Sequence, residues 1–164
     1  EQVVDAYLAE GGNYIETARS YGRGASEDKI GRALQGRRDQ VALCTKTGAK
    51  TADEARRELE QSLAELRTDH VEFCLFHGIG EGELDQITAK GGALEGLQKA
   101  VDEGLVGALG MSSHWPPVYL DAFELLPFKM ILIWCNYHDN LNFPIIPHKV
   151  IPDARKRGIG VTAM

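Results

Sequence analysis

Six short apolar runs recur along the chain at nearly even intervals. Successive runs begin roughly 30 residues apart, which is the length of one β-strand followed by one helix. Several runs are almost continuously apolar, as expected for parallel strands that are covered on both faces. The pattern therefore predicts six parallel strands. They are Tyr14–Ala18, Val41–Lys46, Val71–His77, Gly107–Ser112, Met130–Cys135 and Gly160–Met164.

The segments between these runs have apolar residues at helical spacing. Thr51 and Glu54 form a capping box, and apolar residues then recur every three or four positions up to Leu66. Ser26 is the expected N-cap of another helix, which ends at Gly36. Strands that alternate with helices predict an α/β protein with a parallel sheet. Further helical patterns cover Val3–Ala9, Ala93–Val101, Val118–Leu126 and Asp153–Arg157.

The two ends of the chain leave the architecture open at this stage. Val3–Ala9 is a predicted helix with no strand before it, and Gly160–Met164 is a predicted strand with no helix after it. A doubly wound sheet can close with six strands. A (β/α)8 barrel needs eight strands and typically about 250 residues.

Composition and charge narrow the class of protein. A length of 164 residues suits one domain, and a net charge of −6 does not favour binding to nucleic acid. No stretch approaches the roughly 18 apolar residues of a membrane span. Cys44, Cys74 and Cys135 form no CxxC pair, which favours a reducing compartment. We therefore expect a cytoplasmic protein that binds neither nucleic acid nor membrane.

Four side chains with useful chemistry stand at or just beyond the ends of the first three predicted strands. These are Glu16, Tyr21, Lys46 and His77. Each alone has an ordinary explanation, as a solvated charge or a packed ring. The carboxyl ends of parallel strands meet at one rim, however, so we expect all four to converge there.

The chemistry of this set suits protonation of a carbonyl oxygen while hydride arrives at the carbonyl carbon. An ammonium beside a phenol favours the phenolate and makes the phenol a better proton donor. A carboxylate keeps the lysine charged and in place, and an imidazole orients the carbonyl oxygen. No ligand spacing for a metal recurs, so no metal site is expected.

The stretches around these residues resemble the aldo-keto reductases, in the same order and spacing over nearly the whole chain. The resemblance implies a partial (β/α)8 TIM barrel with about six strands present. Residues 1–164 are then one barrel domain that is incomplete at both ends, and its open strand edges favour self-association. The matching stretches are Asn13–Gly22, Ser26–Gly31, Thr45–Gly48, Leu75–Gly78, Leu109–Ser113 and Gly160–Met164.

The resemblance also implies that the complete protein is an enzyme that uses NADPH to reduce an aldehyde or ketone. Tyr21 is then the proton donor, Lys46 its activating partner and His77 the group that orients the carbonyl. Glu16 stands where the family has an aspartate, so a longer side chain has to pair with Lys46. Four further residues fall on cofactor-binding positions, and only the first keeps the family's residue type. They are Ser112, Ser113, Trp134 and Met164.

Two other functions remain open. Lys46 at a strand end also suits the Schiff base of a barrel lyase or aldolase, which borohydride would trap. The substitutions at Glu16, Trp134 and Met164 also suit a catalytically silent subunit that senses nucleotides or binds partners. Nucleotide binding without turnover of carbonyl compounds would support that alternative.

Overall fold

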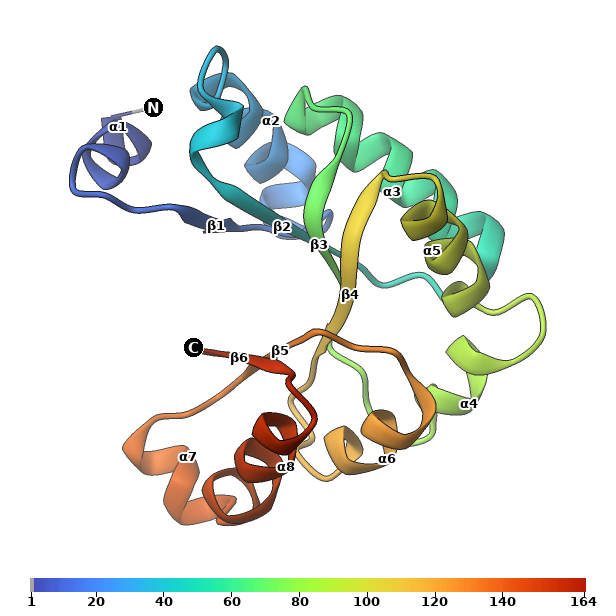
Figure 1. Ribbon diagram of the computed structural model, residues 1–164. Helices are drawn as coiled ribbons and strands as arrows, with labels where there is room; N and C mark the ends of the chain where they lie inside the picture. The colour runs from blue at the N-terminus through green and yellow to red at the C-terminus, as the bar shows by residue number, and fades with distance from the viewer. Residues whose placement is uncertain (1) are drawn as a thin grey trace.

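A computed structural model describes residues 2–164 and shows one parallel sheet that curls into half of a barrel (Figure 1). Its six strands follow the order β1-β2-β3-β4-β5-β6, so each strand pairs with the next one along the chain. Every strand coincides with a predicted run to within two residues at either end, which confirms the predicted partial (β/α)8 barrel. The strands are β1 (Tyr14–Glu16), β2 (Ala42–Thr47), β3 (Val71–Phe76), β4 (Val106–Ser112), β5 (Met130–Ile133) and β6 (Gly160–Ala163).

The helices lie on the convex side of the sheet, and the concave side faces the gap between β1 and β6 (Figure 1). All predicted helices are present. Helices α4 and α7, of six residues each, were not predicted. The helices are α1 (Gln2–Ala9), α2 (Ala25–Ala33), α3 (Ala52–Leu66), α4 (Glu83–Thr88), α5 (Ala93–Asp102), α6 (Val118–Leu125), α7 (Tyr137–Asn142) and α8 (Ile151–Lys156). Short 3₁₀ turns η1 (Tyr21–Gly24) and η2 (Arg38–Gln40) and a π-helical turn η3 (Ile146–Val150) join them.

Helix α2 begins differently from the prediction, whereas α3 begins as predicted. Thr51 caps α3 and accepts a hydrogen bond from the Glu54 N–H at 3.4 Å. The N-cap of α2 is Gly24, with a left-handed φ of 90°, so the prediction of Ser26 as the cap is wrong. The Ser26 hydroxyl instead bonds to the Thr17 hydroxyl at 2.8 Å, which ties α2 to the end of β1.

The sheet separates two apolar layers. The larger one lies between the strands and the helices and includes Leu43, Leu59 and Leu97. Leu43 belongs to β2 and points toward the helices. Because side chains alternate along a strand, Cys44 and Lys46 of β2 point to the concave face. That face carries a smaller cluster and, beyond it, Lys46. The cluster consists of Cys44, Leu75, Met130 and Leu132, with Tyr14 and Phe73 packed against it.

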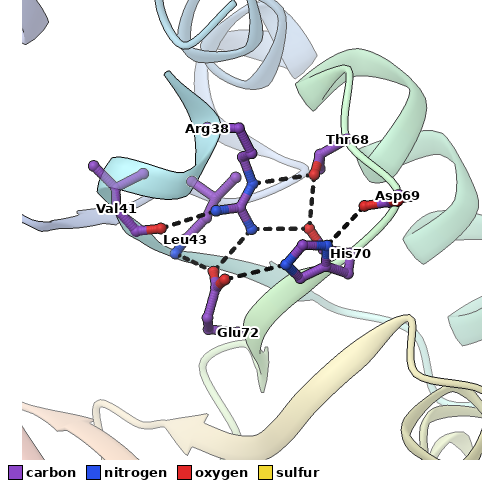
Figure 2. Close-up of polar contacts among 7 residues, drawn as sticks. All are labelled: Arg38, Val41, Leu43, Thr68, Asp69, His70 and Glu72. Carbon is purple, nitrogen blue, oxygen red and sulfur yellow. Dashed lines mark hydrogen bonds and ion pairs between the residues drawn. The ribbon is translucent and has the colours of Figure 1, made fainter. Parts of the chain in front are cut away.

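Two features fix neighbouring strands against each other. A Cβ atom at Gly110 would collide with the carbonyl oxygen of Met130, so β4 and β5 approach closely only because this residue is glycine. At the amino ends of β2 and β3, Arg38 and Glu72 tie these two strands together (Figure 2). Glu72 Oε2 accepts from Arg38 at 2.8 Å and from the Leu43 N–H at 2.6 Å.

The environment of Glu72 sets its protonation. Burial alone would raise the pKa of this carboxyl, but the Leu43 N–H and the Arg38 guanidinium outweigh it and bring the pKa below the ordinary value. The carboxylate is therefore ionised at neutral pH and caps a backbone N–H of β2.

Candidate active site

Lys46 is the centre of the group at the carboxyl ends of β1, β2 and β3. Its side chain lies on the concave face of β2 and the residue is only 1% exposed. The ammonium donates hydrogen bonds to the Thr17 carbonyl oxygen at 3.0 Å and to the Tyr21 phenol oxygen at 3.1 Å. It also forms an ion pair with Glu16. A charge this deeply buried persists only with such partners.

Glu16 reaches Lys46 despite its extra methylene. The carboxylate contacts the ammonium directly from the end of β1, and its side chain is 23% exposed. The pairing of Glu16 with Cys44 in the sheet register sets Lys46 two residues farther along the neighbouring strand. The arrangement therefore gives the buried ammonium an anionic partner.

Tyr21 lies at the start of η1, a turn in which Gly22 and Arg23 both adopt left-handed conformations. The residue is 40% exposed, so its phenol is open to solvent on one side and to Lys46 on the other. The ammonium also lies 4.5 Å from the centre of the ring, a distance typical of a cation–π contact.

His77 completes the group from the end of β3. Its ring meets that of Tyr21 edge to face, with centroids 5.5 Å apart. Burial, together with the nearby Lys46 ammonium, holds the pKa of His77 below its usual range, so the imidazole is neutral at pH 7. A neutral imidazole keeps one N–H with which it can orient a carbonyl oxygen. Arg19, Lys46, His77 and neighbouring residues line a cleft of about 330 Å³ beside the group.

Cys44 lies below Lys46 on the same face and is fully buried. Burial raises the pKa of its thiol to about 12. The thiol is therefore protonated at neutral pH and is not a nucleophile, which agrees with its interpretation as a small apolar side chain.

The four predicted cofactor residues stand at or after the ends of β4, β5 and β6, and two of them are buried serines. Ser112 Oγ accepts from the Gly78 N–H at 3.0 Å, and among residues 2–164 no group accepts from its own O–H. Ser113 Oγ donates to the Ile79 carbonyl at 2.5 Å and accepts from the Trp115 N–H at 2.8 Å. Both hydroxyls thus shape the loops at the rim, and Ser112 alone keeps a proton to donate.

The other two predicted cofactor residues, Trp134 and Met164, are more exposed to solvent. The indole of Trp134 meets His114 edge to face, with ring centroids 4.4 Å apart, and Met164 is 46% exposed at the end of β6. His114 lies two residues after the end of β4 but was not among the predicted site residues. Ser20, whose hydroxyl oxygen lies 3.5 Å from His77 Nδ1, was also missed. The only signal in the sequence was the position of each residue just after a strand.

Comparison with known proteins identifies the family to which the chain belongs. Residues 1–164 match the profile of the Aldo/keto reductase family. The chain belongs to the aldo/keto reductase family. It is 29% identical to the uncharacterized oxidoreductase YqkF of Bacillus subtilis, over 98% of this chain and 53% of that protein.

Solved aldo/keto reductases have the same fold. The glycerol dehydrogenase AKR11B4 of Gluconobacter oxydans is 28% identical, with a TM-score of 0.80 over 98% of this chain and 51% of that one. An aldo/keto reductase of Klebsiella pneumoniae, crystallised with NADP and acetate, is 24% identical, with a TM-score of 0.81 over 99% of this chain and 56% of that one. The chain spans about half the length of the curated relatives it matches. Within residues 2–164, no helix has both the length and the apolar character needed to cross a bilayer.

Proposed function

We propose that the protein containing this chain uses NADPH to reduce an aldehyde or a ketone, with Tyr21 as the proton donor. The observation that carries the proposal is the buried ammonium of Lys46, which touches both the Glu16 carboxylate and the Tyr21 phenol. This arrangement stabilises a phenolate, which is what a tyrosine that gives up its proton needs.

The side chains divide the work around the carbonyl oxygen. Tyr21 transfers its proton to that oxygen, and the Lys46 ammonium stabilises the phenolate that remains. Glu16 keeps Lys46 charged and in place, while the neutral His77 donates a hydrogen bond that orients the carbonyl. Because Tyr21 is 40% exposed, solvent can return a proton to it after each turnover.

The donor set fits a nicotinamide cofactor, because it supplies a proton and an oriented carbonyl but contains no hydride donor. Bound NADPH supplies that hydride. The hydroxyl of Ser112, which still has a proton to donate, and the Trp134 indole are the groups we propose to hold it, with Met164 at the neighbouring strand end. Ser113 contributes by shaping the loop, since its hydroxyl is already engaged.

The relatives support this proposal. YqkF is described as an oxidoreductase, and the Klebsiella pneumoniae protein was crystallised with NADP. The contacts of Lys46 also argue against the Schiff-base alternative, because an ammonium that donates to three oxygens has no lone pair for attack on a carbonyl.

The proposal is tested by following NADPH oxidation with the full-length protein and a panel of aldehydes and ketones. We expect turnover that Lys46→Met abolishes and Lys50→Met preserves, because Lys50 pairs with Glu83 at the start of α4, outside the group. A covalent adduct after borohydride treatment would support the lyase instead. NADPH binding without turnover of any carbonyl compound would support the silent subunit.

We also propose that residues 1–164 act as a single domain in the cytoplasm and that its sheet edges pair with further strands. Among the described residues, β1 and β6 each pair on one side only. Unpaired edges promote association. The chain expressed alone is therefore expected to sediment as dimers or larger species, and a monodisperse 18.0 kDa monomer would contradict this.

A further inference from the structure

Glu27 is a fully buried carboxylate outside the group around Lys46, at the start of α2. Its two oxygens bind different segments of the chain. Oε2 pairs with the Arg19 guanidinium at 2.9 Å, and Oε1 accepts from the Thr45 hydroxyl at 2.6 Å. A buried carboxylate that satisfies both oxygens in this way holds its two partners at a fixed separation.

The two partners are neighbours of the proposed proton donor and of its activating lysine. Arg19 lies two residues before Tyr21, and Thr45 lies directly before Lys46. The Arg19 N–H also donates to the Lys46 carbonyl at 3.2 Å. Glu27 therefore links the loop that carries Tyr21 to the strand that carries Lys46.

The link matters because the loop adopts an unusual backbone conformation. Between Arg19 and α2 it passes through left-handed conformations at Gly22, Arg23 and Gly24, and Tyr21 itself is 40% exposed. The Arg19 guanidinium packs against Gly24, where an added Cβ would lie 3.4 Å from Nη1. Arg19 thus fixes the turn from both ends.

We propose that Glu27 is a positioning residue, which sets the distance between the Tyr21 phenol and the Lys46 ammonium by holding Arg19 and Thr45 on its two oxygens. The inference rests on the proposed function for its effect on catalysis. The positioning itself is a statement about the loop and can be measured without turnover.

Each link has a disruptive and a conservative variant. Thr45→Val removes the hydroxyl and keeps the shape, whereas Thr45→Ser keeps the hydroxyl. Arg19→Met removes the charge and keeps the length, whereas Arg19→Lys keeps the charge. Asp28→Asn is the matched control, since Asp28 lies on the same helix and pairs with Arg32 and Arg67.

In the full-length protein we expect Thr45→Val and Arg19→Met each to lower kcat about ten- to hundredfold, because small displacements of a catalytic group have effects of that order. KM should change less than threefold. Thr45→Ser, Arg19→Lys and Asp28→Asn should retain most activity. Because both links act through one carboxylate, the Arg19→Met/Thr45→Val double variant should be little worse than either single variant.

A second readout does not depend on catalysis. The ring NMR signals of Tyr21, identified by their loss in Tyr21→Phe, should shift or broaden in Thr45→Val and stay in place in Thr45→Ser. If the wild type shows no turnover but these shifts occur, the proposed function fails and the positioning role stands. Unchanged Tyr21 signals in folded Thr45→Val, a raised KM at constant kcat, or multiplied effects in the double variant would each overturn the inference.

Discussion

Replacing Tyr21 by phenylalanine separates the chemistry of the phenol from the stability of the fold. The ring remains, and with it the edge-to-face packing on His77 and the 4.5 Å approach of the Lys46 ammonium to the ring centre. The substitution removes the 3.1 Å hydrogen bond from Lys46 to the phenol oxygen, but the ammonium still has Glu16 and the Thr17 carbonyl as partners. We therefore expect a decrease of about 0.5–1.5 kcal/mol in the free energy of unfolding.

The effect on carbonyl reduction should be much larger. A positioned proton donor contributes a factor of about 10²–10⁴ to the rate, which corresponds to about 2.7–5.4 kcal/mol of transition-state free energy. NADPH affinity should change little, because the phenol acts on the oxygen of the carbonyl substrate. The variant should thus lose several times more transition-state stabilisation than folding stability.

The assay compares steady-state NADPH oxidation, cofactor titration and urea unfolding for the wild type and Tyr21→Phe. Tyr137→Phe serves as the control, because Tyr137 is 82% exposed on α7. Activity within a few-fold of the wild type would show that Tyr21 is not the acid. A loss of activity matched by an equal loss of stability would show that the phenol only supports the structure.

Three further predictions concern charge and packing. Glu16→Asp should keep most activity, because the carboxylate retreats only about 1.5 Å. Glu16→Gln should lower kcat at least tenfold, because it removes the anionic partner of the Lys46 ammonium. Equal activity of the two variants would refute this. Gly110→Ala should cost about 1–3 kcal/mol in urea unfolding, because the new methyl meets the Met130 carbonyl, while Gly48→Ala, with open space around it, should cost much less. The lowered pKa of Glu72 means that its stabilising effect is present above the ordinary carboxyl pKa and is lost as the pH falls through the lowered value. Glu72→Gln should therefore destabilise the protein at pH 7 and lose this effect in acid, and a difference in unfolding free energy that does not change with pH would contradict the assignment.

The strands and the group around Lys46 could be predicted because both follow from local pattern. Apolar runs mark the strands, and polar residues just after them must meet at one rim. The direction of the Ser113 hydroxyl could not be predicted, since it depends on the Ile79 carbonyl, 34 residues away. The start of α2 could not be predicted either, because its N-cap is the left-handed Gly24, which has no side chain to form a capping hydrogen bond.

The same limit applies to Glu27. In the sequence it is one of several acidic residues in the first turn of a helix, where carboxylates are common. Only the tertiary structure shows that Arg19 and Thr45 both meet it.

The neighbour-by-neighbour strand order has a consequence for how the chain folds. Every strand finds its partner roughly one βα unit away, so no pairing has to wait for a distant part of the chain. During synthesis each new unit can dock on the edge left by the one before it, and the sheet grows in the order in which it is translated. In the chain expressed alone, the amide hydrogens of β1 and β6 should therefore exchange first and those of β3 and β4 last.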